Sequence, residues 1–349
     1  MGVGGMKKIG LLVAALIVVP LYAGASQDKA KIIIKIATLA PRGETGMFEQ
    51  FKDRVMEATN NEVYFKAYYG GIQGDESDVL RKIRFGQLHG GAFTGHGLGK
   101  IVPEVRLTEL PYLFRNYGEV TYVRSKLKHT MEALFREKGY EVLAWGEVGF
   151  VYSFSKVPIT SIDVARSQKW WMWEGDPLGQ AMFDALGITP VPLPLTDVLT
   201  SLSTRMIDTA SSTPFGAVAF RWYTRFNCMN EYPSMNAIGA LIVTKKKWDR
   251  ITPESRKKIK EIMADHYKHA LEIERDQNTR AIETLKKAGI TIVRTEPDSD
   301  TGTFVLDAAK KARESLVGVL YSREMLDETL MYLEEYRAAH PDSEVMKIK

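Results

Sequence analysis

The chain has 349 residues, of which 45% are hydrophobic and 26% are charged, and its formal net charge is +4 at pH 7. Removal of Lys7 and Lys8 with an N-terminal leader leaves 4 − 2 = +2, a charge too small to favour nucleic acid as a partner. A chain of this length can bury a large core and is expected to form two domains.

The first 25 residues have the pattern of a cleavable export signal. A short basic start at residues 6–8 precedes an apolar run over residues 9–19, and small residues at 23–25 suit a cleavage site. The apolar run is about 11 residues long, well short of the ~20 that a membrane-spanning helix needs. The sequence therefore predicts a signal peptide over residues 1–25 and a periplasmic protein that begins near Ser26.

Strand and helix patterns alternate in the first part of the mature chain. A run of β-branched residues predicts the first strand, and Asp75 and Gly86 are typical of the start and the end of a helix. The expected elements are a strand at 31–39, a helix at 45–58, a turn and strand at 60–71, a helix at 75–86 and a strand at 90–95. This β-α-β-α-β order predicts a mostly parallel sheet with helices on its faces.

A second α/β pattern follows a long strand-like run at 140–155, which has no helical period and is long enough to pass between two domains. Thr252 and Pro253 later begin a helical pattern that reaches Gly289, a helix of about 36 residues or ~54 Å. Between them we expect a strand at 169–173, a helix at 177–186, an extended segment at 188–195, a helix capped by Thr196 and a strand at 206–213.

These patterns predict both a fold class and a division of the chain. The fold class is α/β, with two lobes joined by hinge strands and one long helix that lies across both lobes. The segments 145–155 and about 233–243 are expected to act as the hinges. Lobe I is expected at 31–148 plus about 237–276, lobe II at 149–236 plus about 277–335, and a C-terminal tail at 336–349.

None of the polar motifs forms a catalytic constellation. The segment "GHGLGK" at 95–100 lacks the spacing of a phosphate loop and is expected to be a flexible turn. His266 and His269 lie three residues apart on the long helix, but no third metal ligand is evident. Asp176 stands before a proline and is typical of a helix cap, and Cys228 is the single cysteine. We therefore expect a binding protein that is not an enzyme and that needs neither a metal nor a cofactor.

Three of the six tryptophans stand in the segment "KWWMWEGDP", residues 169–177. Strand alternation places Trp171 and Trp173 on one face and the residues beside them on the other. One face can pack against helices while the other presents two indoles to the region opposite, although both faces could equally be core. Trp145 and Phe150 on the crossing strand favour a shared aromatic cavity.

Five segments of the chain occur in an order that characterises one family. They are "IKIATLAPRGETGMFEQFKDRV", "YYGGIQGDESDVLRKIRFGQLHGG", "LPYLFRNYGEV", "ITPVPLPLTDVLTSLSTRMID" and "ALIVTKKKWDRITPESRKKI". In this order they resemble the DctP-type solute-binding proteins of tripartite ATP-independent periplasmic (TRAP) transporters, over essentially the whole mature chain. The resemblance implies two hinged α/β lobes that close on a ligand, with a long helix across both.

The same resemblance implies a function and partners. Such a protein captures a small solute in the periplasm and delivers it, without catalysis, to a membrane permease of the TRAP type or of another, unusual type. A homodimer formed through the exposed long helix is a further hypothesis.

The chain departs from the family where the resemblance implies arginine anchors for a substrate carboxylate. One arginine position falls on Trp171 and another on Val151. Loss of such a buried partner costs a carboxylate ligand ~2–5 kcal/mol, whereas a large aromatic side chain offers ~150–250 Å² for burial. We therefore predict a neutral or largely hydrophobic ligand whose polar end meets Glu147, Thr94 or Thr213.

Three alternatives stay open at this point. A cationic ligand could be held by cation–π contacts to Trp171 and Trp173 with help from Glu174. An organic acid could be bound by a relocated arginine such as Arg42, or the aromatic face could dock a periplasmic partner protein. The predicted ligand-binding residues are Thr38, Phe93, Thr94, Trp145, Glu147, Phe150, Val151, Trp171, Trp173, Thr213, Phe215 and Asn236.

Overall fold

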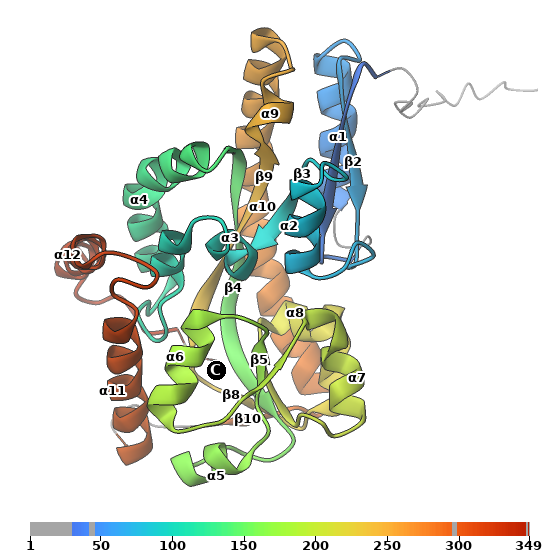
Figure 1. Ribbon diagram of the computed structural model, residues 1–349. Helices are drawn as coiled ribbons and strands as arrows, with labels where there is room; N and C mark the ends of the chain where they lie inside the picture. The colour runs from blue at the N-terminus through green and yellow to red at the C-terminus, as the bar shows by residue number, and fades with distance from the viewer. Residues whose placement is uncertain (1–29, 42–45, 295–298, 347, 349) are drawn as a thin grey trace, which may run out of the picture.

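The computed structural model describes residues 30–41, 46–294, 299–346 and 348. The predicted signal peptide and Arg42 lie outside the described residues. Figure 1 shows two lobes, one above the other, with one long strand and one long helix running through both. The predicted α/β class with two lobes is therefore confirmed.

Lobe I, the upper lobe in Figure 1, is built on three parallel strands, which are extended by one strand antiparallel to them and then by another that pairs antiparallel with that one. In this sheet β1 (Ile32–Thr38) lies between β2 (Val63–Tyr68) and β3 (Gly90–Thr94), as the predicted β-α-β-α-β order requires. Next to β3 come β9 (Met235–Thr244) and then β4 (Tyr140–Ser155). The helices of this lobe are α1 (Gly46–Ala58), α2 (Glu76–Arg84), α3 (Gly95–Gly99), the 3-10 helix η3 (Pro103–Glu109), α4 (Tyr117–Glu137) and α9 (Lys245–Trp248).

Lobe II, the lower lobe, adds short strands to the far end of β4. Antiparallel to β4 lie β7 (Thr209–Ser212) and β8 (Cys228–Asn230), and β10 (Thr291–Val293) pairs parallel with β8. The tryptophan segment forms β5 (Trp171–Trp173), which pairs parallel with β6 (Val191–Leu193). The helices are α5 (Ile162–Ser167), α6 (Pro177–Leu186), the 3-10 helix η4 (Leu195–Asp197), α7 (Val198–Ser203), α8 (Pro214–Ala219), the 3-10 helix η5 (Trp222–Arg225) and α11 (Asp300–Ser315).

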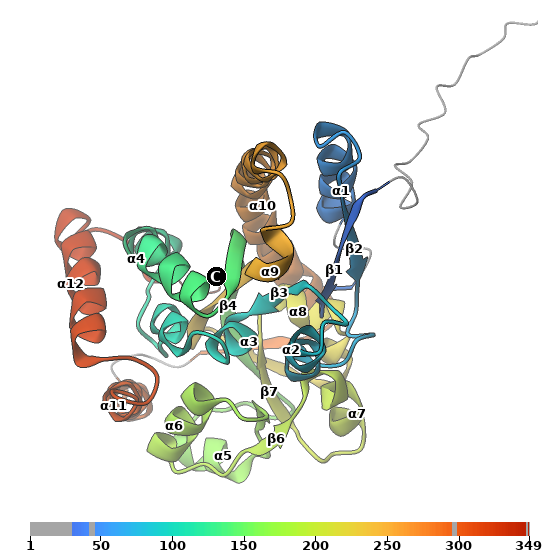
Figure 2. The same cartoon turned by 45° about the horizontal axis from the view of Figure 1, so that its top comes forward.

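Two elements pass from one lobe to the other. β4 pairs with β9 from Tyr140 to Val151 and with β7 from Tyr152 to Ser155, so a single strand belongs to both lobes. Helix α10 (Pro253–Lys287) packs against α1 in lobe I and against α8 in lobe II, and it can be followed in Figures 1 and 2. The predicted long helix across both lobes is therefore confirmed.

The helix starts follow from local capping chemistry. The Asp176 side chain accepts a hydrogen bond from the backbone N–H of Leu178 at 3.2 Å and caps α6, as its place before a proline predicts. The Thr252 hydroxyl likewise accepts from the backbone N–H of Ser255 at 3.3 Å at the start of α10. These caps satisfy backbone donors that the first helical turn leaves without partners.

Three local expectations are wrong. The "GHGLGK" segment forms the short helix α3 rather than a flexible turn. Thr196 lies inside η4, and α7 starts after Asp197 without a side-chain cap. Helix α12 (Arg323–Ala339) extends past residue 336, the expected start of the tail, and packs against α4 of lobe I. The remaining lobe boundaries stay predictions. Across the described ranges, no helix combines the length and the apolar character that crossing a bilayer requires.

Candidate ligand-binding cleft

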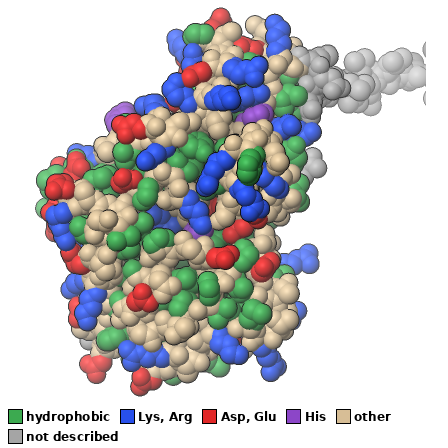
Figure 3. Space-filling view, viewed as in Figure 1, with side chains coloured by type: hydrophobic (Ala, Val, Ile, Leu, Met, Phe, Trp, Pro, Cys, Tyr) green, Lys and Arg blue, Asp and Glu red, His purple; other side chains and the backbone are tan. Residues whose placement is uncertain are grey.

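A cavity of about 520 Å³ lies between the two lobes, on one side of β4. This volume is in the range of small-molecule sites. In the space-filling view the lobes meet across a boundary, and hydrophobic side chains gather on the lower lobe beneath it (Figure 3). The cavity is lined by nine of the twelve predicted residues, which are Thr38, Phe93, Thr94, Glu147, Val151, Trp171, Trp173, Thr213 and Phe215.

The tryptophans of β5 form one wall of the cavity. Trp171 and Trp173 lie with ring centroids 5.7 Å apart, and Trp171 also meets the edge of Trp222 at 5.4 Å. Trp170 points to the other side of the strand, where its indole N–H donates to the carbonyl of Ala165 at 2.7 Å. The predicted alternation is therefore confirmed. Trp171 is only 7% exposed, so its side chain packs in the hydrophobic core and also lines the cavity.

Trp173 and Asp176 connect lobe II to lobe I across the cleft. The Trp173 indole N–H donates to the Asp75 carboxylate at 2.7 Å, and its ring stacks on His96 with centroids 4.6 Å apart. Arg106 donates from Nη2 to Asp176 Oδ2 at 3.2 Å. The side chains of Asp75, His96 and Arg106 belong to lobe I, so these contacts join the two lobes across the cleft.

A β-bulge in β4 decides which of its side chains face the cleft. Glu147 pairs with Ile238 and Gly149 pairs with Ala237, so Val148 is an extra residue on this strand. Since side chains alternate along a strand, the extra residue exchanges the two faces. Trp145 and Glu147, which precede this bulge, therefore face the α4 side, and Phe150, which follows it, does so too.

The bulge turns Trp145 and Phe150 toward α4, and three predicted site residues lie outside the cleft lining. The Trp145 indole N–H donates to Glu132 of α4 at 3.2 Å, and Phe150 packs against Tyr117 of α4 with ring centroids 4.8 Å apart. Asn236 pairs with Phe150 and is fully buried. Trp145, Phe150 and Asn236 are therefore not part of the cleft lining, and the predicted shared aromatic cavity is wrong.

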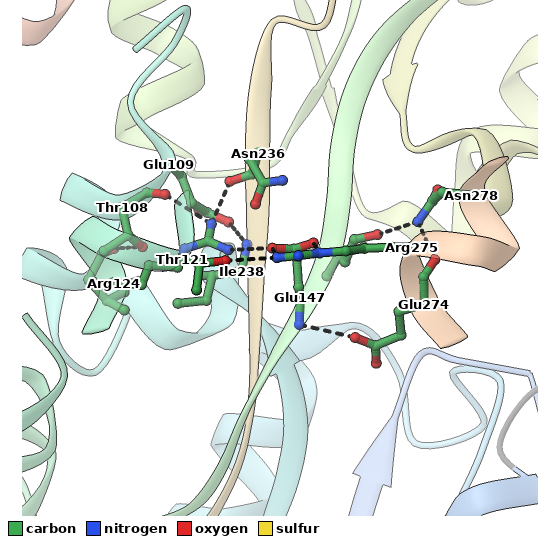
Figure 4. A network of polar contacts seen from close by, with 12 residues as sticks. Thr108, Glu109, Thr121, Arg124, Glu147, Asn236, Ile238, Glu274, Arg275 and Asn278 are labelled. Carbon is green, nitrogen blue, oxygen red and sulfur yellow. Dashed lines mark hydrogen bonds and ion pairs between the residues drawn. The ribbon is translucent and has the colours of Figure 1, made fainter. Parts of the chain in front are cut away.

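Glu147 borders the cleft, but its carboxylate is engaged on the opposite side of β4. Arg275 of α10 donates to Glu147 from Nε at 3.0 Å and from Nη2 at 3.1 Å, and Arg124 of α4 lies 3.5 Å away (Figure 4). The predicted contact of Glu147 with the polar end of a ligand is therefore not favoured by this geometry. Gly149, at φ +114°, was the available signal, because an isolated glycine in a strand indicates a bulge.

The charged groups of the cleft are mostly carboxylates. Arg106 is the only lysine or arginine among the described lining residues. Burial by itself would lower the pKa of Arg106, but the nearby carboxylates of Asp176 and Glu109 outweigh this effect and raise it. Burial raises the pKa of Glu76 to about 8 and that of Glu274 to about 7. Both groups therefore carry much of their proton at neutral pH. The lining carboxylates are Glu76, Glu109, Glu147, Asp176 and Glu274.

Sequence reasoning missed Arg106, Asp75 and His96. Arg106 is 4% exposed, and its ion pair with Glu109 joins Nε to Oε2 at 3.2 Å. Burial lowers the pKa of His96 to about 3, so this ring is neutral. No short motif marks these side chains, because the fold brings them together from separate segments. Within the described ranges, no group of three or more His, Cys, Asp or Glu side chains is arranged to hold a metal ion.

Comparison with known proteins identifies the class of molecule. Residues 40–309 match the family model DctP, bacterial extracellular solute-binding protein, family 7. The chain belongs to this family, whose members bind small solutes for transport through membrane permeases and are not enzymes.

Individual relatives are similar at low identity. The 2,3-diketo-L-gulonate-binding periplasmic protein YiaO of Escherichia coli (strain K12) is 24% identical over 275 residues, which cover 77% of this chain and 81% of that protein. A TRAP periplasmic solute-binding protein of Xanthobacter autotrophicus Py2 with bound β-D-galacturonate matches with a TM-score of 0.79 at 18% identity, over 86% of this chain and 99% of its own. Another, from Desulfovibrio salexigens with bound orotic acid, has a TM-score of 0.79 at 18% identity, over 88% of this chain and 99% of its own.

Proposed function

We propose that this protein is the periplasmic receptor of a TRAP-type transport system and that it captures a small organic acid with a substantial apolar body. The ligands named for its relatives, a diketogulonate, a galacturonate and orotic acid, support an acid more than the neutral or hydrophobic ligand that the sequence suggested. The observation that carries the proposal is a single cleft that combines an indole wall with one buried guanidinium, Arg106.

Arg106 is the group best placed to meet the acid. A guanidinium has five N–H donors in a planar fork, and in the described residues Arg106 has one hydrogen bond, to Asp176, and the ion pair with Glu109. Donors therefore remain for a ligand carboxylate, which a guanidinium can bind bidentately. Trp171 and Trp173 then pack against the apolar body of the ligand.

An uncharged apolar solute is the second candidate. It is favoured by Trp171 and Val151, which stand where the family resemblance implies arginines, and both line the cleft. Arg106 also already faces two carboxylates, Glu109 and Asp176. A ligand without charge would leave these ion pairs undisturbed.

The test compares each candidate acid with its own primary amide. The bound solute is released from purified protein by denaturing extraction and identified by mass spectrometry, and both forms are titrated calorimetrically. We expect the amide to bind about 10- to 100-fold more weakly, because it loses the charge-assisted hydrogen bonds that a carboxylate accepts from Arg106. Equal affinity for acid and amide supports the second candidate, and a protein that binds neither form contradicts both.

Two further parts of the proposal concern partners and location. Export through the segment 1–25 would place the receptor beside its permease, and fractionation of cells with and without that segment tests it. Pairing of two chains through α10 remains a prediction, which sedimentation of the purified protein tests. If the aromatic face docked a partner protein instead, Trp171→Ala would abolish that complex and leave small-molecule affinity unchanged.

A further inference from the structure

A second cavity, of about 480 Å³, lies on the opposite side of β4 from the cleft. Its walls are α4 and α10, which flank this strand in Figures 1 and 2. Much of its surface is apolar, and this part is formed by Leu127, Met131, Trp145, Met263 and Leu271. The cavity is therefore nearly as large as the cleft, and it is lined by one indole, that of Trp145.

The charge of this cavity is opposite to that of the cleft. Glu132 and Glu147 are its only carboxylates among the described lining residues. Against them stand five cationic side chains, which are Arg124, Lys128, Arg136, Lys260 and Arg275. Glu141, which is not a lining residue, pairs with Arg136 and Lys260, so the five cations exceed the three carboxylates around them by 5 − 3 = 2, beside an apolar surface.

Arg124 is the cation with the least compensation. Its Nη2 donates to the backbone carbonyls of Thr108 at 3.0 Å and Asn236 at 2.8 Å, while its buried Nε has no hydrogen-bond partner in the described residues (Figure 4). Its ion-pair partner, Glu147 at 3.5 Å, already receives two hydrogen bonds from Arg275. Burial lowers the pKa of Arg124 to about 10. One carboxylate thus serves two guanidinium groups, and a buried charge without full compensation is costly.

We propose that the cavity between α4, β4 and α10 is a second small-molecule site, which binds an anion on an apolar body. The carboxylate, sulfonate or phosphate group of such a ligand lies by Arg124 and Lys128, and the apolar body packs on Trp145. This site is separate from the solute cleft, and it does not depend on which solute the cleft takes.

Naphthalene-2-sulfonate and its uncharged analogue naphthalene-2-sulfonamide are suitable probes, titrated calorimetrically into the mature protein. We expect the sulfonate to bind at least about tenfold more tightly than the sulfonamide, and the rim variant Lys128→Glu to weaken it by about tenfold. Lys128 is half-exposed at the rim and its ion pair with Glu132 is 4.0 Å long, so we expect this variant to fold. Lys126→Glu is the matched control, since Lys126 is on the same helix but pairs with Glu335 outside the cavity.

The controls separate the second site from the cleft and from general charge effects. The sulfonate should keep its affinity in Trp171→Ala, because Trp171 lines only the cleft. The proposal is wrong if the sulfonate does not bind, if Lys126→Glu weakens it as much as the rim variant, or if only Trp171→Ala weakens it. None of these results depends on the affinity of the cleft for its own solute.

Discussion

The two sides of β4 offer cavities of similar size and opposite chemistry. On the cleft side, Trp171 and Trp173 stand near a single guanidinium and several carboxylates, whereas on the α4 side Trp145 stands near five cations. The inserted residue Val148 decides which side chains of β4 face each cavity, while the cations come from α4 and α10 and the two cleft tryptophans from β5. A family resemblance locates the cleft, but the local register decides which side chains enter it.

The largest expected effect comes from Glu147, the carboxylate that neutralises the α4 side. Glu147→Gln should lower the free energy of unfolding by about 3 kcal/mol, because it leaves Arg124 buried without a counter-charge. Urea denaturation measures this change. Adding Arg124→Met should restore part of the loss, and a single variant as stable as the parent would show that the two guanidinium groups need no carboxylate.

Trp173 and Trp145 allow a matched comparison of the two sides. Each indole N–H donates to a carboxylate, but only the Trp173 bond, to Asp75, joins the two lobes. Trp173→Phe should weaken solute binding by about 10- to 100-fold, the value of a hydrogen bond to a charged group. Trp145→Phe should change it by less than about twofold. Equal losses in the two variants, measured by calorimetry, would mean that the cross-lobe bond does not stabilise the closed form.

Gly149 tests the bulge itself. Its φ of +114° is unfavourable for other residues, and a Cβ there would stand 2.6 Å from Nδ2 of Asn278, which also donates to the carbonyl of Val148. Gly149→Ala should lower the free energy of unfolding by about 2 kcal/mol. Gly239→Ala on the neighbouring strand is the control, because its nearest contact would be 3.5 Å and it should be nearly neutral. Indistinguishable stabilities would argue against the bulge.

The smallest expected effect is a pH dependence in the cleft. Burial raises the pKa of Glu274 to about 7, so this group is mostly neutral at pH 6 and mostly charged at pH 8. An anionic solute should therefore bind about three- to tenfold more tightly at pH 6 than at pH 8. Glu274→Gln should remove the pH dependence of the solute affinity below pH 7. The pH dependence that remains above pH 7 is then due to Glu76, whose pKa is about 8. An unchanged profile in Glu274→Gln would place the solute away from α10.

Much of the fold could be predicted from the sequence, because its signals are local. The strand and helix order of lobe I, the cap at Asp176 and the long helix from Thr252 follow from patterns within a few residues. The alternation of Trp171 and Trp173 also follows, since a short regular strand has a fixed period.

The rest depends on contacts between distant segments. The orientation of Trp145, Glu147 and Phe150 depends on pairing with β9, which no pattern within β4 reveals except the glycine at 149. Arg106 reaches the cleft because η3 packs against α3 and β9, and its partner Asp176 belongs to the other lobe. Arg42, which lies outside the described residues, was only an example of a relocated arginine in one alternative, and sequence reasoning overlooked Arg106.

The central claim is that the transported solute binds on the cleft side of β4, against the β5 tryptophans. The direct measurement is a ¹⁵N–¹H spectrum of the indole groups during titration with the solute recovered from the protein, with each signal assigned by a Trp→Phe variant. The Trp171 and Trp173 signals should shift together to saturation while the Trp145 signal stays in place. A shift of Trp145 alone, with Trp171 and Trp173 unmoved, would contradict the claim.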